Sequence, residues 1–280
     1  MTTPVFLAVL CAALLHASWN TLVKIGEERF VGVALIAIFS GAVSLCGLAW
    51  VGLPNLSSLP WLLLSLVLHT GYCLFLSRAY GQGDLGQIYP LARGSAPLLA
   101  MMLSALFLRE YPPLLGVIGA LVLVSGVLLM ALRGGGRRKL NGKAVRYALV
   151  TAMFTAGYTL SDGAGARAAE APLTYTLWLF TLNGIIMLPL LWLHQRGKTW
   201  GQIKRNWRVG LAGGTMSLLA YGIVIWALTQ APIGVVAALR ESSVLFAMIF
   251  SVWLLKEPMG KARIAASLVI VTGVMLSRLG

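Results

Sequence analysis

Long apolar runs follow one another along the whole chain, separated by short polar breaks or breaks that contain glycine and proline. A helix needs about 20 mostly apolar residues to cross a bilayer. These runs are apolar on every face, unlike the alternating segments of an outer-membrane barrel. The pattern predicts an all-α integral membrane protein with ten transmembrane helices, at about 4–23, 31–51, 61–80, 86–108, 113–132, 146–164, 172–193, 209–229, 233–255 and 263–279.

The chain also repeats itself. Residues 93–129 lie over residues 240–276 without a gap, and 16–22 lies more loosely over 155–161. We infer two five-helix units, 1–132 and 144–280, joined by a basic linker at 133–143. Because five is odd, the second unit enters the membrane in the opposite orientation, which makes the repeats inverted, an architecture typical of transporters. The matched pairs include Arg93 with Arg240, Ala100 with Ala247, Met101 with Met248, Ser104 with Ser251, Glu110 with Glu257, Gly126 with Gly273 and Trp19 with Tyr158.

Composition excludes several classes of protein. The chain is 59% hydrophobic and only 11% charged, whereas soluble domains are about a quarter charged. The net charge of +14 comes from basic residues that sit mainly between the apolar runs, so they indicate membrane topology and not a nucleic-acid partner. The three cysteines lie inside apolar runs without paired spacing, and the histidines are scattered. We therefore expect no disulfide framework, metal, cofactor or enzymatic centre.

The ends of the two units, "LFLREYPPLLGVIGALVLVSGVLL" and "WLLKEPMGKARIAASLVIVTGVML", carry an aliphatic run, a glutamate, a loop, a glycine and an aliphatic helix. They resemble the end of the EamA repeat of the drug/metabolite transporter superfamily, and "LLHASWNTLVK" resembles the first helix of that repeat. The resemblance covers nearly the whole chain. It implies ten helices, secondary active transport and a multi-pass protein of the bacterial inner membrane, but it leaves the substrate open.

Two arguments about orientation disagree. If the helices alternate, seventeen of the 22 Lys and Arg residues lie on one face and only Arg109, Arg167 and Arg278 on the face of the termini. The positive-inside rule then places both termini outside the cell. The family resemblance implies that both termini are cytoplasmic.

Arg93 and Arg240 are the main candidates for the site. Each lies about seven residues into its predicted helix, about 10 Å deep in a core of about 30 Å. An arginine at this depth is costly unless it snorkels, pairs, or faces a wet cavity. Glu241 follows Arg240, so it is placed to neutralise that residue, bind a substrate amine or take up a proton. Arg93 is followed by Gly94, which makes Arg93 the better candidate for an anionic group.

Further candidates surround these residues. In the predicted helix 86–108, Tyr89 shares a stripe with Arg93, and Pro90 and Pro97 either unwind the helix or only kink it. His16 and Asn20 share a face of the first helix beside Trp19, and His16 is a second coupling candidate. Tyr158 and Tyr72 are placed to add aromatic surface or to pack in the core. Asp162 falls near a predicted helix end, and Glu110 is expected to pair with Arg109 or to orient the next helix.

These residues favour a secondary transporter of a small polar metabolite with an anionic group, such as a phosphate, phosphonate or carboxylate, amino acids included. The alternative is an exporter of multidrug, cationic or aromatic compounds. The expected partners are the substrate, membrane lipids and either a proton or a counter-substrate, and not nucleic acid. Both a monomer and a homodimer are compatible with the sequence, and so are import and export.

Overall fold

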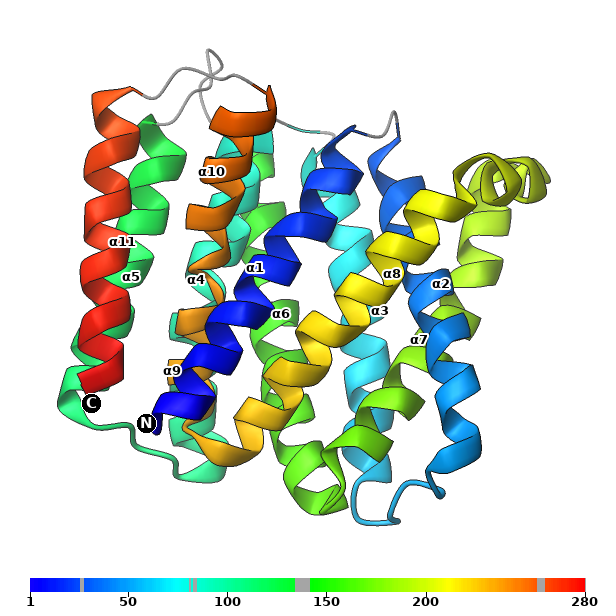
Figure 1. The fold of residues 1–280 in the computed structure, drawn as a ribbon, viewed down its shortest axis with the longest axis horizontal. Coiled ribbons are helices and arrows are strands. Elements are labelled where there is room, and N and C mark those ends of the chain that lie inside the picture. Colours follow the sequence, from blue (N-terminus) through cyan, green and yellow to red (C-terminus); the bar gives the residue numbers. More distant parts are fainter. Residues whose placement is uncertain (26–27, 81, 83–84, 134–141, 256–259, 280) are drawn as a thin grey trace.

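Each apolar run of the sequence forms helix in the computed structural model (Figure 1), which leaves residues 26–27, 81, 83–84, 134–141, 256–259 and 280 outside the described part of the chain. The described elements are α1 (Thr3–Ile25), α2 (Arg29–Gly47), the short 3-10 helix η1 (Leu48–Trp50), α3 (Leu59–Tyr80), α4 (Leu85–Leu108), α5 (Leu114–Arg133), α6 (Gly142–Ala169), α7 (Pro172–Gln195), α8 (Thr199–Gln230), α9 (Ile233–Arg240), α10 (Ser243–Leu255) and α11 (Lys261–Leu279). Most of the predicted linker 133–143, and Glu257 with its neighbour Lys256, lie outside the described residues.

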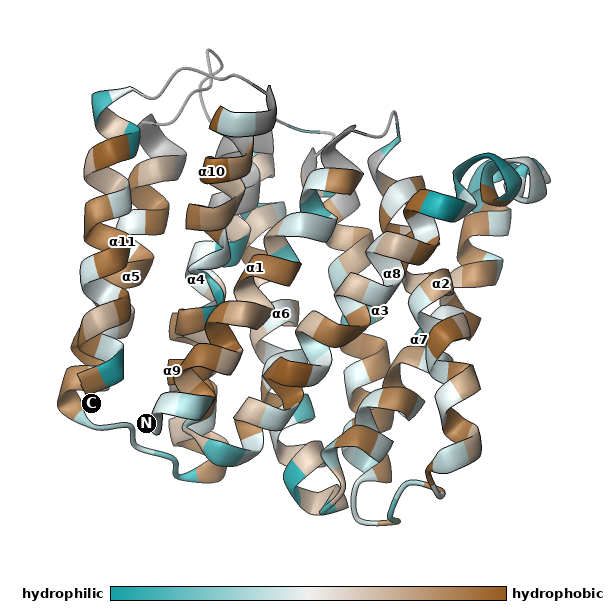
Figure 2. Cartoon of the chain, viewed as in Figure 1, coloured by the Kyte–Doolittle hydropathy of each residue, from teal (hydrophilic) through white to brown (hydrophobic). Residues whose placement is uncertain are grey.

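Eight segments of the described chain are long and apolar enough to cross a membrane, with the apolar stretch Ile233–Phe250 of α9 and α10 counted as one. Of the ten predicted spans, the remaining two correspond to α5, where the apolar stretch Leu114–Met130 is shorter, and α6, whose many small and polar residues lower its hydropathy. Large apolar side chains such as Leu106, Phe107 and Trp253 are exposed on the outside, and apolar residues run along most of the helix lengths (Figure 2). A water-exposed surface of this kind would be unfavourable, so the protein is a multi-pass membrane protein.

The two units differ where their sequences match. α4 stays helical through Arg93 although it contains Pro90 and Pro97, so of the two alternatives left open by the sequence, unwinding at these prolines does not occur. In the second unit the single predicted helix 233–255 is instead two helices. Their junction is a tight turn in which the amides of Glu241 and Ser242 donate to the carbonyls of Ala238 and Leu239.

Two close helix crossings join the units at glycines. At one, α2 meets α7, and a methyl group added to Gly41 would lie 2.9 Å from Cα of Gly184. At the other, α5 lies beside α11 (Figure 1), and a methyl group on Gly126 would lie 2.9 Å from the backbone nitrogen of Ile270. Gly273, the partner of Gly126 in the repeat, sits against the backbone of Leu123 at the same crossing. Small residues let helix backbones approach closely in membranes, where packing drives association.

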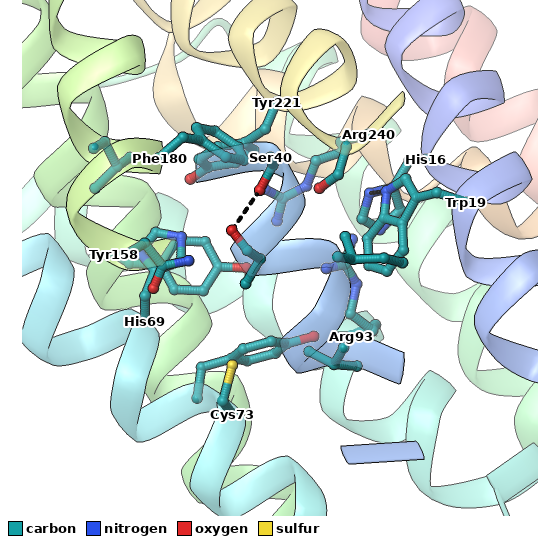
Figure 3. A pocket seen from close by; sticks show the side chains of 17 residues that line it. His16, Trp19, Ser40, His69, Cys73, Arg93, Tyr158, Phe180, Tyr221 and Arg240 are labelled. Carbon is teal, nitrogen blue, oxygen red and sulfur yellow. Dashed lines mark hydrogen bonds between the residues drawn. The ribbon is translucent and has the colours of Figure 1, made fainter. Parts of the chain in front are cut away.

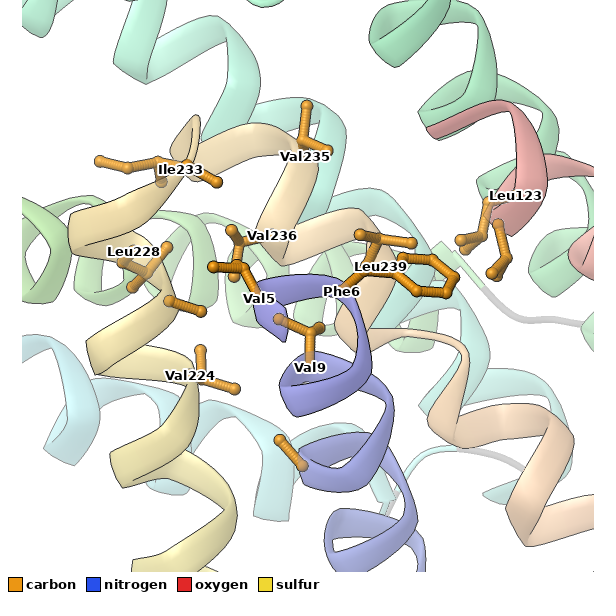
Figure 4. Packing of buried hydrophobic residues seen from close by; sticks show 14 of the residues in the cluster. Val5, Phe6, Val9, Leu123, Val224, Leu228, Ile233, Val235, Val236 and Leu239 are labelled. Atoms are coloured by element: carbon orange, nitrogen blue, oxygen red, sulfur yellow. The ribbon is translucent and has the colours of Figure 1, made fainter. Parts of the chain in front are cut away.

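The largest apolar cluster fixes α9 in place. Val5 and Val9 of α1 and Val224 and Leu228 of α8 pack around it (Figure 4). All eight residues of α9 are buried, including its last residue, Arg240. A short helix that is apolar and enclosed on every side holds its end in a fixed position, and here that end carries a charge into the bundle.

Candidate functional site

A cavity of about 110 Å³ lies inside the bundle, between side chains from both sequence units (Figure 3). It is lined by His16 and Trp19 of α1, Val33, Ile36, Ala37 and Ser40 of α2, His69, Tyr72 and Cys73 of α3, Arg93 of α4, Tyr158 of α6, Leu179, Phe180 and Asn183 of α7, Ser217 and Tyr221 of α8, and Arg240 of α9. Aromatic rings form much of the wall, and the two arginines are its only permanently charged members among the described residues.

Arg93 is held by a carboxylate from the other unit. Its Nε donates to Oε2 of Glu241 over 3.2 Å, and its Nη2 donates to Oε1 over 2.9 Å. Both side chains are almost completely buried. Such a forked pair matches the planar guanidinium to both carboxylate oxygens, the strongest geometry available to these groups. The carboxylate that the sequence placed beside Arg240 therefore pairs mainly with Arg93.

Arg240 is left with most of its donors free. Its Nε lies 3.6 Å from Oε1 of Glu241, an ion pair without a hydrogen bond, and within the described chain its guanidinium makes no hydrogen bond. Its Cζ lies 5.9 Å from the centre of the Tyr221 ring. Arg240 is only 2% exposed and lines the cavity. A buried guanidinium costs free energy unless its donors are satisfied, so this group is the clearest place for an acceptor-bearing ligand.

His16 supplies a second unmatched atom. Nε1 of Trp19 donates to Nδ1 of His16 over 3.2 Å, which leaves Nε2 to carry the proton of the neutral ring. Nε2 is buried and has no hydrogen-bond partner in the described part of the chain. Asn20, in contrast, donates to the carbonyl of His16 within its own helix and does not line the cavity. The first helix thus brings His16 and Trp19 to the cavity and leaves Asn20 outside it.

An aromatic group closes the opposite wall. His69 stacks on Tyr158 with ring centres 4.0 Å apart, and Tyr72 meets Tyr158 edge-on at 5.7 Å. Tyr221 lies edge-on to both His69 and Tyr158, at 5.8 and 6.1 Å. The structure brings Tyr72 and Tyr158 to the cavity. Tyr89 belongs to α4, but its side chain lies outside the described residues.

The carboxylate of Asp162 lies behind this wall, fully buried within α6 and not at a helix end as the sequence suggested. Its Oδ1 accepts hydrogen bonds from Ser65 over 2.5 Å and from Tyr175 over 3.1 Å, and its Oδ2 accepts one from Tyr221 over 2.5 Å. α6 continues to Ala169 because its last turns consist largely of small residues that pack tightly, as at Gly165, where the Tyr175 ring fills the space that a side chain would take.

A cluster at one end of the bundle ties the units together. Nη2 of Arg167 in α6 donates to Oε1 of Glu110 over 2.9 Å, and the other oxygen of Glu110 accepts the amide of Ile233. Arg167 also donates to the carbonyls of Leu228 and Ala231, where α8 turns into α9. Glu110 thus bonds to the second unit. Pairing with Arg109, one of the two roles that the sequence suggested, is not observed among the described residues.

Several cavity residues carried no motif in the sequence. Ser40, Asn183 and Ser217 lie in mostly apolar runs that also hold other small polar residues, and Phe180 is one of several aromatics. The one signal was the amide side chain of Asn183 within a predicted span. Among the described residues, no group of three or more His, Cys, Asp or Glu side chains is placed to hold a metal ion.

Known proteins resemble this chain in fold and in sequence. A protein of known crystal structure is similar to this chain, with a TM-score of 0.76 and 18% sequence identity, over 100% of this chain and 98% of the other, which establishes the fold alone. No curated protein sequence gives a significant match. The sequence profile described as "EamA-like transporter family" matches twice, at residues 3–132 and 142–279, and together the matches span nearly the whole length. The chain therefore belongs to the EamA-like transporter family.

Proposed function

We propose that this protein is a secondary active transporter of a small polar metabolite with an anionic group, a phosphate, phosphonate or carboxylate, amino acids included. The observation that carries the proposal is Arg240. Its guanidinium lines the cavity without a single hydrogen bond in the described chain, and the nearest carboxylate already binds Arg93 in a fork. An anion placed against Arg240 would satisfy these donors.

Charge and size support the same ligand. Arg93, Arg240 and Glu241 together carry one net positive charge next to the cavity, so an anion would neutralise the group and a cation would be repelled. The cavity of about 110 Å³ is smaller than the roughly 300 Å³ or more of pockets for drug-sized molecules. This size favours a small metabolite over a multidrug substrate. The aromatic walls would pack against the uncharged part of the ligand.

Alternating access is the mechanism we propose for the movement of this ligand. The cluster of Arg167 and Glu110 joins α6, the α4–α5 connection and the α8–α9 turn, and would close one face while the other admits substrate. Opposed directions of α5 and α11, which end at opposite faces (Figure 1), support an inverted relation between two five-helix units, 1–132 and 144–280. We expect the protein to act in a bacterial inner membrane.

Ligand-induced thermal stabilisation tests the proposal. The purified protein would be melted with inorganic phosphate, methylphosphonate, L-glutamate, or the cation tetraphenylphosphonium, in wild type, Arg240→Gln and the matched surface control Arg278→Gln. We expect an anion to raise the melting temperature of wild type and of the control. The affinity of the Arg240→Gln variant for that anion should be about 10- to 100-fold lower, as expected for the loss of a charge-assisted hydrogen bond.

Stabilisation by the cation that persists in Arg240→Gln would reject an anionic substrate and support the rival, an exporter of cationic or aromatic compounds. Uptake of the stabilising compound into vesicles that contain the protein, and not into empty vesicles, then separates a transporter from a protein that only binds it.

A further inference from the structure

Glu241 and Asp162 are both fully buried carboxylates, but they have different partners. Glu241 lies between two guanidinium groups, at hydrogen-bond distance from Arg93 and 3.6 Å from Arg240. Asp162 accepts its hydrogen bonds from three uncharged hydroxyl groups, on three different helices. A proton added to Glu241 would break a buried ion pair, whereas a proton added to Asp162 breaks none among the described residues.

Asp162 is connected to the cavity although it does not line it. Tyr221 donates its hydroxyl hydrogen to Asp162, and its ring faces both the cavity and the guanidinium of Arg240. On the other side, Oγ of Ser65 lies 3.1 Å from Nδ1 of His69, whose ring stacks on Tyr158 in the cavity wall. A change at Asp162 therefore reaches both the aromatic wall and the free arginine through one intervening side chain.

The hydrogen-bond count shows what a proton would do. An ionised carboxylate only accepts, and these three hydroxyls fill three of its roughly four acceptor positions, whereas a carboxylic acid has one O–H that must donate. Protonation of Asp162 therefore requires at least one hydroxyl to turn away from it or to accept in its place. If Tyr221 turns, its hydroxyl becomes available toward the cavity beside Arg240; if Ser65 turns, its contact with His69 changes.

We propose that Asp162 is the proton-binding site that couples a proton to substrate movement, with Tyr221 as the link to Arg240. This inference rests on the proposed transport function and assigns the coupling role to Asp162 in place of Glu241 or His16. The buried titratable and charged groups around Asp162 on the packed elements include His69 on α3, Arg93 on α4, Tyr158 and Arg167 on α6 itself, Tyr175 on α7, Tyr221 on α8 and Arg240 on α9. Arg93 and Arg167 are bonded to Glu241 and Glu110, so neither serves as the partner of Asp162.

Infrared spectroscopy tests the proton site without a substrate. The full-length protein in lipid vesicles would be titrated from alkaline to acid pH while the carbonyl stretching band of protonated carboxylic acids is recorded. We expect a band that appears in wild type, in Glu241→Gln and in the matched control Thr155→Val, whose hydroxyl donates to the backbone of the same helix. Exposed carboxylates also contribute to this band at acid pH, so the expected result is the loss of one component of the band in Asp162→Asn. An unchanged band in Asp162→Asn, or the loss of that component in Glu241→Gln alone, would overturn the proposal.

A second variant, Tyr221→Phe, tests the proton site if Asp162→Asn does not fold. Tyr221→Phe keeps the carboxylate and removes one hydroxyl that stabilises its ionised form, so the same band should appear at a higher pH than in wild type. An unchanged titration in Tyr221→Phe would show that the titrating group is not the one bonded to this hydroxyl, which contradicts the assignment.

Transport in vesicles tests the coupling. With inorganic phosphate, methylphosphonate or L-glutamate as probe, wild type should accumulate the probe that it carries when a pH gradient is imposed. Asp162→Asn should lose accumulation driven by the gradient but retain exchange of labelled for unlabelled probe. Accumulation that persists in Asp162→Asn, or that follows a sodium gradient, would overturn the coupling role. If wild type carries none of the probes, the proposed function fails, and the infrared titration still decides whether Asp162 binds the proton.

Discussion

Residues 93–108 and 240–255 match each other in sequence, but their backbones differ at the second residue. In the first segment Gly94 lies inside a continuous helix, and a methyl group there would be 3.2 Å from the Val127 side chain, so even the smallest side chain would be tightly packed at this position. In the second segment the matching residue is Glu241, where the helix breaks. One carboxylate thus serves the arginine of the opposite segment, and its own neighbour Arg240 keeps its donors for the cavity.

Glu241→Gln should have the largest effect on this arrangement. The change removes the charge that both buried arginines share, and breaking a buried ion pair from one side costs about 3–5 kcal/mol. The free energy of unfolding, measured by chemical denaturation in detergent, should fall by this amount. Glu170→Gln removes an exposed carboxylate at the end of α6 and should change stability by less than about 0.5 kcal/mol. Equal losses in the two variants would contradict the shared role of Glu241.

Lysine substitutions at Arg93 and Arg240 should have smaller effects on stability, and the two effects should differ. Arg93→Lys keeps the charge but loses the forked geometry, and should cost about 2 kcal/mol, in the range for hydrogen bonds to charged groups. Arg240→Lys loses no hydrogen bond described in the structure and should cost less than about 1 kcal/mol. Thermal melts of the two variants side by side provide the measurement. The opposite order would mean that Arg240, not Arg93, holds the carboxylate.

Glu110→Gln should have only a small effect on stability. The pair with Arg167 is about one-third exposed on the arginine side, and such pairs contribute about 1 kcal/mol or less. The larger expected effect is on how easily a reagent enters the cavity, because this pair joins the units at the face that carries both termini (Figure 1). A cysteine introduced at Ser217, in the cavity wall, should react faster with a thiol reagent applied from that face in Glu110→Gln than with Glu110 intact. Unchanged reactivity would argue against a closing role for the pair.

The helices were predictable because a bilayer imposes long apolar runs. The errors lie where this constraint does not apply. α8 begins at Thr199, ten residues before the predicted start, in a polar segment that includes Lys204 and Arg205. α6 continues past Asp162 through the small residues of "GAGARAA", whose low hydropathy looks like a helix end although tight packing keeps them helical. The helix break after Arg240 could not be predicted, because no proline or glycine follows Arg240 at the break.

The sequence identified the charged residues of the site, but it did not show which of them pair with each other. Arg93, Arg240 and Glu241 stood out because charges are rare and costly within apolar runs. The pairing of Arg93 with Glu241 joins residues 148 positions apart, and neither residue's local sequence indicates it. Neighbourhood in the chain suggested that Glu241 would neutralise Arg240, whereas the turn after α9 directs the carboxylate toward α4. The substrate-binding roles of all three residues stay predictions.

The break between α9 and α10 has a further consequence for the order of its two charged residues. A helix carries partial negative charge at its C-terminal end and partial positive charge at its N-terminal end. Arg240 is the last residue of α9, and Glu241 lies just before the first turn of α10. Each side chain therefore has the sign that its helix end favours. A chain with the two residues exchanged would have the same composition and net charge, but both helix dipoles would then oppose the charges at the break.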